Sequence, residues 1–138
     1  RMKTYLNKIN YKGMVFDSTT IDNFWLYGES KITQIQQIQF LKRFYFSELP
    51  ISKRTESVLK NIMFVEKSAD YTLSGKTGLS VKNELYNGWF VGYFEVKNNV
   101  YFFATNLEPL KKEAANEAFY SARINATKQA FKNLNFLK

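Results

Sequence analysis

The chain has 138 residues, the usual length of a single domain and enough to bury a core of ordinary size. Apolar residues make up 45% of it and aromatic residues 17%, which excludes general disorder. The net charge is +8, but the lysines are scattered and mixed with 12 acidic residues, so they predict a solvated basic surface and no nucleic-acid partner.

Helices are predicted in the first half of the chain. Apolar side chains at helical spacing indicate a helix over residues 1–9, whereas residues 14–30 show no period and are expected to be irregular. Thr33 can cap a second helix, which runs to about Phe46 and is stopped by Pro50. The inner face of this helix is expected to carry Ile35, Ile38, Leu41, Phe44 and Tyr45.

A short third helix is predicted to begin after Ser52, which is a good capping residue. Its inward side chains are expected to be Val58, Leu59, Ile62 and Met63. The period then changes to two, so strands are predicted over residues 71–78, 88–96 and 100–107, the last two forming a hairpin. A terminal helix is predicted from about Leu110. Its stripe facing the sheet is expected to be Phe119, Ala122, Ala126, Ala130 and Leu134.

This order of elements predicts an α+β fold in which helices flank an antiparallel sheet. Residues 1–65 are expected to be mainly helical, and residues 66–138 to hold the sheet strands and the terminal helix. The predicted sheet leaves an edge that needs cover, so we expect further strands from polypeptide outside this sequence. The chain begins with Arg1 and not with Met, which suits a processed or excised part of a longer domain.

Several kinds of chemistry are excluded by composition. Cysteine and histidine are absent, so this chain contains no disulfide, no zinc site of the usual kind and no Ser-His-Asp triad. Gly75-Lys76-Thr77 ends like a phosphate-binding loop, but that loop needs a glycine where this chain has Asp70. We therefore expect no metal and no nucleotide. No apolar run approaches the roughly 18 residues of a membrane span.

The most specific pattern is Lys76-Thr77-Gly78 on a predicted strand, followed by the aromatic hairpin that starts at Gly88-Trp89. Residues 21–32 match a D-x-F-W-L-x-G-x-L-x-I pattern in all but one of its fixed positions, and Leu49-Pro50 precedes the strands. Further matches are Gln37, Phe40-Leu41, Gly92, Tyr101-Phe102-Phe103-Ala104, Asn106-Leu107 and Ser121-Ala122-Arg123. Together these segments resemble the class D (oxacillinase-type) serine β-lactamases over nearly the whole chain.

The resemblance implies a β-lactamase/penicillin-binding-protein transpeptidase-like fold that is incomplete without an N-terminal half. The family's Ser-x-x-Lys and Ser-x-Val motifs precede the region present here, so the nucleophile is expected on the missing part. Ser57 to Lys60 spell Ser-x-x-Lys, but they lie too close to Lys76 and within a helical stretch, which indicates a chance match. The family usually carries Tyr-Gly-Asn where this chain has residues 11–13, Tyr-Lys-Gly.

The resemblance also assigns roles to residues of the strand. Lys76 and Thr77 would bind the carboxylate of a β-lactam, and Gly78 would leave room for the substrate against the strand. The N–H of Leu79 would be one of two oxyanion-hole donors, the other being on the missing serine. The alternative is an ordinary strand whose lysine and threonine face solvent.

Three residues outside the strand complete the predicted site. Trp25 would hold, through its indole N–H, a lysine that carbon dioxide converts to a carbamate, which acts as general base; no other cofactor is expected. Leu26 would form an apolar wall, and the planar guanidinium of Arg123 would bind the substrate carboxylate. The alternatives are a core tryptophan and a surface arginine.

The implied function is hydrolysis of β-lactam antibiotics by the whole protein, in the periplasm or otherwise outside the cytoplasm, with this chain inactive alone. The expected partners are β-lactams and the complementary N-terminal segment. Two alternatives stay open. One is the β-lactam-binding sensor domain of a penicillin-responsive signal transducer, and the other is a homologue that has lost catalysis.

Overall fold

The computed structural model describes residues 1–27, 29–110 and 116–137. Gly28 of the matched segment 21–32 and residues 111–115 of the predicted terminal helix lie outside the described residues. Nine elements follow along these residues: α1 (Met2–Lys8), α2 (Phe24–Tyr27), α3 (Gln34–Tyr45), α4 (Lys53–Met63), β1 (Phe64–Lys67), β2 (Tyr71–Lys82), β3 (Leu85–Val96), β4 (Asn99–Leu107) and α5 (Glu117–Asn133). None of the helices in these ranges combines the length and the apolarity that crossing a membrane requires.

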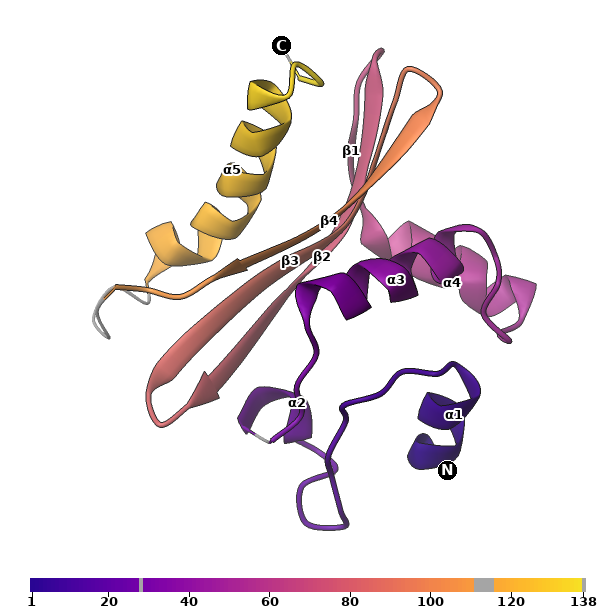
Figure 1. Cartoon of the computed structure of the whole chain (residues 1–138), viewed down its shortest axis with the longest axis vertical. Coiled ribbons are helices and arrows are strands. Elements are labelled where there is room, and N and C mark those ends of the chain that lie inside the picture. The colour runs from indigo at the N-terminus through magenta and orange to yellow at the C-terminus, as the bar shows by residue number, and fades with distance from the viewer. Residues whose placement is uncertain (28, 111–115, 138) are drawn as a thin grey trace.

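The strands form one antiparallel sheet in the order β1-β2-β3-β4, with helices on both sides (Figure 1). α5 packs on one face, whereas α3 and α4 pack on the other. The predicted α+β class is therefore confirmed. Thr33 caps α3 as predicted, since its side chain accepts from the N–H of Gln36.

The sheet contains one strand more than the sequence predicts. β1 follows α4 without a break and pairs only with the start of β2, from Lys67 opposite Thr72 to Phe64 opposite Ser74, with a bulge between. β1 has only four residues, two of them charged, so its alternation of apolar and polar side chains is too weak to indicate a strand. The boundary between the helical part and the sheet accordingly lies at residue 64. A short helix, α2, also lies within the stretch 14–30 that was expected to be irregular.

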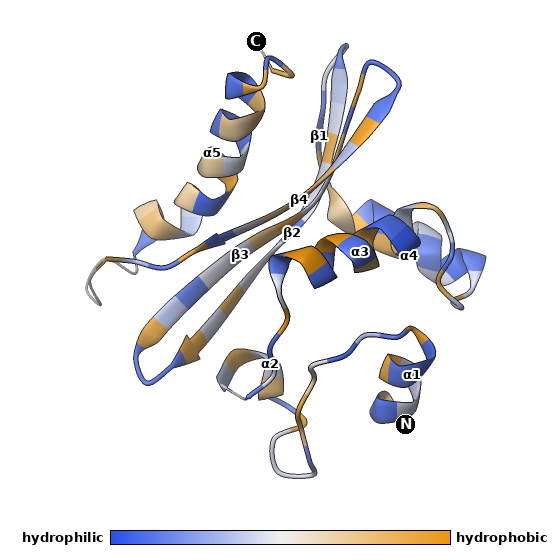
Figure 2. Cartoon of the chain, viewed as in Figure 1, coloured by the Kyte–Doolittle hydropathy of each residue, from blue (hydrophilic) through white to orange (hydrophobic). Residues whose placement is uncertain are grey.

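The main core lies between the sheet and α5, and Figure 2 shows the apolar segments of β3 and β4 that contribute to it. Phe94 is fully buried, and its ring stacks on Phe131 of α5 with 4.4 Å between the ring centroids. A second core joins α3 to the opposite face through Phe44, Leu49 and Tyr93. Helices thus pack on both faces of the sheet.

The predicted inner stripe of α5 is wrong beyond Phe119. The buried residues of this helix are Phe119, Arg123, Thr127 and Phe131, whereas Ala126, Ala130 and Leu134 are exposed and Ala122 is half-buried. Thr127 and Arg123 are buried because their polar groups are paired: the Thr127 hydroxyl contacts that of Thr105, and Arg123 reaches the backbone of β2. A pattern that counts only apolar residues cannot find such a face.

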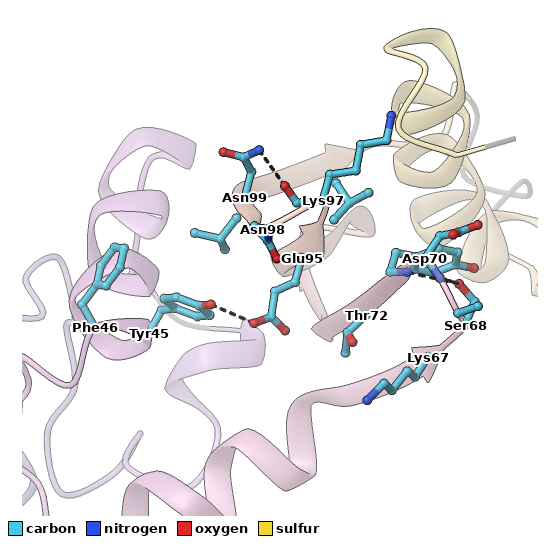
Figure 3. A pocket seen from close by; sticks show the side chains of 14 residues that line it. Tyr45, Phe46, Lys67, Ser68, Asp70, Thr72, Glu95, Lys97, Asn98 and Asn99 are labelled. Carbon is cyan, nitrogen blue, oxygen red and sulfur yellow. Dashed lines mark hydrogen bonds between the residues drawn. The ribbon is translucent and has the colours of Figure 1, made fainter.

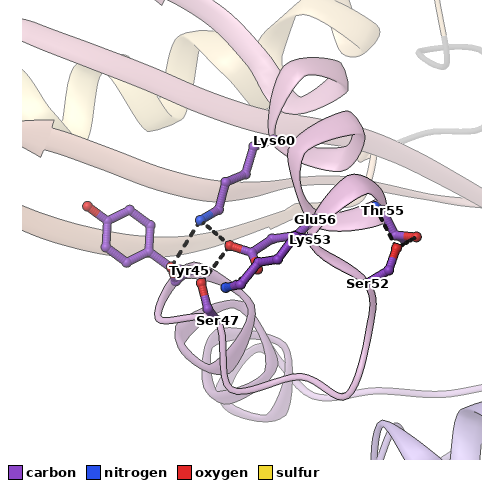
Figure 4. Close-up of polar contacts among 7 residues, drawn as sticks. All are labelled: Tyr45, Ser47, Ser52, Lys53, Thr55, Glu56 and Lys60. Carbon is purple, nitrogen blue, oxygen red and sulfur yellow. Dashed lines mark hydrogen bonds and ion pairs between the residues drawn. The ribbon is translucent and has the colours of Figure 1, made fainter.

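The inner faces predicted for α3 and α4 are also partly wrong. Ile35 of α3 is exposed, and so are Val58, Leu59 and Ile62 of α4, whereas Met63 packs against the second core as predicted. The buried residue of α4 is the charged Glu56. Its carboxylate accepts from the hydroxyl of Ser47 at 2.6 Å and from the ammonium of Lys60 at 2.7 Å (Figure 4). Lys60 also donates to the carbonyl of Tyr45 at 3.3 Å, so this cluster fastens α4 to the end of α3.

We predict that Glu56→Gln lowers the melting temperature at neutral pH but not in acid. Hydrogen bonds from Lys60 and then from Ser47 hold the pKa of Glu56 at about 2, below its ordinary value of 4.5. A carboxyl with a depressed pKa stabilises the fold above its unfolded pKa, and this stabilisation is lost as pH falls towards 2. Thermal melts of both proteins should therefore draw together below pH 4.5 and converge near pH 2. A melting difference that stays constant with pH would contradict this origin. Glu48→Gln, at an exposed carboxylate between α3 and α4, serves as the control.

Candidate active site at the edge of the sheet

Lys76, Thr77 and Gly78 lie on a stretch of β2 that has a neighbouring strand on one side only. β2 pairs with β3 along its whole length, with Gly78 opposite Trp89. On its other side β1 pairs no further than Ser74. Among the described residues, β2 is therefore an edge strand from residue 75 to residue 82, and its outward backbone groups are available to a ligand.

The outward groups include those of Leu79. At the turn before β2, the N–H of Ser68 donates to the carbonyl of Tyr71 at 2.9 Å, so the backbone groups of Tyr71 face the β1 side. The pairing of β2 with β3 runs without a shift from Tyr71 to Lys82, and backbone groups in such a ladder alternate between the two sides. Leu79 follows Tyr71 by an even number of residues, so its N–H also points to the open side.

The side chains of the Lys-Thr-Gly segment divide between the two faces. Leu73 belongs to the core under α5, so by alternation Thr77 lies on the α5 face and Lys76 on the face of α3. Lys76 is exposed, and its ammonium donates to the carbonyl of Thr77 at 3.1 Å. A Cβ on Gly78 would meet only the Cβ of Trp89, at 3.7 Å, an ordinary contact. Packing within the described residues therefore does not require glycine at this position.

Arg123 reaches the same segment from the α5 face. It is 8% exposed, so the alternative of a surface arginine is wrong. Its Nη1 donates to the carbonyl of Gly78 at 2.5 Å, and its Nε donates to the carbonyl of Tyr120 at 3.1 Å. The structure thus brings Arg123 to the strand that carries Lys76 and Gly78, and Lys76 and Arg123 approach the edge from opposite faces.

Trp25 and Leu26 lie on α2, which packs against β2 on the same side of the sheet as α3 (Figure 1). Trp25 is 57% exposed, so it is no core tryptophan; the core residue is its neighbour Phe24, whose ring lies 4.7 Å from that of Phe16. Leu26 is half-buried. An ion pair between Glu29 and Lys82 also joins the segment after α2 to the end of β2.

Gly88 and Asn106 are site neighbours to which sequence reasoning gave no role. A Cβ on Gly88 would lie 2.9 Å from Cδ of Arg123, so the arginine crosses β3 where a side chain is missing. Asn106 donates to the side chain of Asn87 at 2.7 Å and to the carbonyl of Gly88 at 3.4 Å, which ties β4 to β3 beside this crossing. Both residues belong to motifs that the sequence matches, and this match could have indicated that they lie near the site. Only the structure shows what they contact.

A hollow of about 510 Å³ lies at the opposite end of the sheet and contains none of the predicted site residues (Figure 3). Tyr45 of α3 lines it and donates its hydroxyl to Glu95 of β3 at 2.7 Å. Burial, and then the bond to the Glu95 carboxylate, raise the pKa of Tyr45 to about 12, so the hydroxyl keeps its proton. This contact joins α3 to the sheet and has no evident part in the site.

The comparisons with known proteins agree with one another. The family model of the penicillin binding protein transpeptidase domain matches residues 1–134. Beta-lactamase OXA-48 of Klebsiella pneumoniae is 38% identical over 108 residues, which are 78% of this chain and 40% of that protein. Regulatory protein BlaR1 of Bacillus licheniformis is 36% identical over 118 residues, which are 85% of this chain and 19% of that protein.

Among solved structures, the class D β-lactamase YbXI from Nostoc superposes with a TM-score of 0.88 at 40% identity. The match covers 99% of this chain and 56% of that one. The chain therefore spans about half the length of the β-lactamases that it matches and a smaller part of BlaR1.

Proposed function

The chain belongs to the penicillin-binding-protein transpeptidase domain family, and we propose that it forms the substrate-binding edge of a class D β-lactamase that hydrolyses β-lactam antibiotics. The observation that carries the proposal is the open stretch of β2. It combines the outward N–H of Leu79 with the exposed ammonium of Lys76, and Arg123 supports it from behind. An anionic substrate with an electrophilic carbonyl is the ligand that such an edge suits.

In the proposed reaction, a serine supplied by polypeptide outside this sequence attacks the lactam carbonyl. The C–N bond of the lactam breaks, its nitrogen takes up a proton, and an ester to the serine remains. Water then hydrolyses this ester, with a carboxylated lysine, also outside this sequence, as the base. Within this chain, Leu79 N–H would stabilise the oxyanion that forms in both steps.

The other residues would position the substrate and the base. The substrate carboxylate would be bound by Lys76, by the Thr77 hydroxyl and by Arg123. One Nη1–H of Arg123 already donates to the Gly78 carbonyl, so the substrate would be bound by the other N–H groups of the guanidinium. The indole N–H of Trp25, a residue that is largely exposed, would hold the carboxylated lysine, and Leu26 would form an apolar wall. The domain would work in the periplasm or elsewhere outside the cytoplasm.

A second candidate is a β-lactam sensor, which the similarity to BlaR1 over 85% of this chain favours. Such a domain would be acylated by the same groups but would release the acyl group very slowly. The two proposals differ in one rate, that of acyl-enzyme breakdown. Fast turnover supports the enzyme, and a persistent acyl-protein supports the sensor.

We predict that the isolated chain does not hydrolyse nitrocefin, because the nucleophile lies outside it. A chimera that joins this chain to the part of the Nostoc β-lactamase that it does not cover should hydrolyse nitrocefin and form an acyl-protein with a labelled penicillin. Turnover by the isolated chain would refute the proposed division of the site. A folded chimera that binds no penicillin would refute the proposed function.

A further inference from the structure

The Gly78–Leu79 peptide group joins two features of the site. A trans peptide is planar, and its C=O and N–H point in opposite directions. The C=O of Gly78 accepts from Arg123 at 2.5 Å, whereas the N–H of Leu79 faces the open edge of β2. One rigid unit therefore carries the arginine contact at one end and the proposed oxyanion donor at the other.

We propose that Arg123 positions and polarises the Leu79 N–H through this peptide group, and that Gly88 is the residue that makes the contact possible. The inference rests on the proposed function, since the N–H matters only if an oxyanion forms beside it. It gives Arg123 a task that is separate from binding a substrate carboxylate.

The electrostatics favour such a coupling. Arg123 is 8% exposed, so the field of its guanidinium is weakly screened by water. A charge-assisted hydrogen bond draws electron density towards the Gly78 oxygen, which makes the N–H of the same peptide a stronger donor. The second bond of Arg123, from Nε to the carbonyl of Tyr120 at 3.1 Å, fixes the orientation of the guanidinium.

Gly88 supplies the path that Arg123 takes across the sheet. It lies on β3 opposite Leu79, next to the Gly78–Trp89 pair. A Cβ here would lie 2.9 Å from Cδ of Arg123 and 3.0 Å from Cζ of Phe119, both too close. Because Cδ lies in the middle of a side chain that is anchored at both ends, Gly88→Ala should displace the guanidinium from Gly78.

The test observes this one peptide group in the 138-residue chain without any β-lactam. The sequence contains a single Gly–Leu step, Gly78–Leu79, so labelling glycine with ¹³C at the carbonyl and leucine with ¹⁵N gives one carbonyl–amide NMR correlation. In Arg123→Met and in Gly88→Ala we expect the Gly78 carbonyl and the Leu79 amide proton both to move upfield. The amide signal of Leu73, in the same strand, should stay in place and so report that the variants are folded.

Two controls separate coupling from general disturbance. Arg43→Met removes another arginine that donates to a backbone carbonyl, that of Ile9 at 2.9 Å, and should leave the Gly78–Leu79 signal unchanged. Adding Gly88→Ala to Arg123→Met should produce no further shift, whereas an effect through Phe119 would persist in the double variant.

A Leu79 amide proton that stays in place while the Gly78 carbonyl moves would overturn the proposal, and so would a Gly88→Ala shift that does not depend on Arg123. If Gly88→Ala does not fold, Arg123→Met alone decides. The outcome is independent of penicillin binding by the chimera, so failure of the proposed function would be recognised separately.

Discussion

Gly92→Ala is expected to be the most destabilising single substitution at the site, because it forces apart the two strands that carry it. A Cβ on Gly92 would lie 2.0 Å from the carbonyl oxygen of Ser74 and 2.6 Å from Cα of Gly75. Both are backbone atoms of β2 just before Lys76, and they cannot move without shifting the strand. We expect a loss of about 3 kcal/mol or more in the free energy of unfolding, which lowers the melting temperature by about 10 °C.

The measurement is a thermal or urea melt of the 138-residue chain, with Gly78→Ala as the matched control. Gly78 lies on the same strand pair, but a Cβ there would meet its nearest neighbour, the Cβ of Trp89, at 3.7 Å. The control should therefore melt close to the wild-type temperature. Equal melting of both variants would mean that the strands separate easily at Gly92 and that the close approach is not a constraint.

Lys76→Ala is expected to have the largest effect on chemistry. In the chimera with the Nostoc β-lactamase, it should slow acylation by penicillin about 100-fold, the order of the loss when one preorganised hydrogen-bond donor is removed from an active site. The physical reason is that the Lys76 ammonium is an exposed cation on the open stretch of β2, where the substrate carboxylate is proposed to bind, whereas the exposed Lys82 at the end of this stretch is paired with Glu29. Stopped-flow acylation with a chromogenic or labelled β-lactam measures the rate.

Lys67→Ala is the control for a nonspecific charge effect. Lys67 is also an exposed lysine of the sheet, but it lies on β1 at the far end, beside the 510 Å³ hollow. Its removal changes the net charge equally and should leave the acylation rate unchanged. Similar rates for wild type and Lys76→Ala would remove Lys76 from the proposed site.

The sequence predicted best where local chemistry decides the structure. The cap at Thr33, the aromatic strands and the hairpin at residues 97–99 depend on neighbours in the chain, and the structure places them as predicted within a few residues. The prediction failed at β1, whose four residues are a strand because β2 lies beside them. Strand pairing over such a short length leaves little trace in the residues themselves.

At the candidate site, too, the sequence predicted the local features, and the features that depend on contacts between strands and helices appeared only in the structure. The Lys-Thr-Gly segment, with Leu79 after it, predicted the strand, which the structure confirms, and the type of ligand that is proposed to bind there. Sequence alone could not find that the Leu79 N–H points outward, because that depends on the register between β2 and its neighbours. It also could not find that Arg123 is buried, since an arginine is buried only where a carbonyl such as that of Gly78 receives it.

By itself, the sequence of this protein determined its family, its α+β class and the strand on which a β-lactam is proposed to bind, because motif spacing and periodicity are properties of the chain. The tertiary structure alone decided which backbone groups are open, which face of α5 is buried and why glycine is needed at position 88. These features are contacts between residues far apart in sequence, and their energies depend on distances that no local pattern specifies.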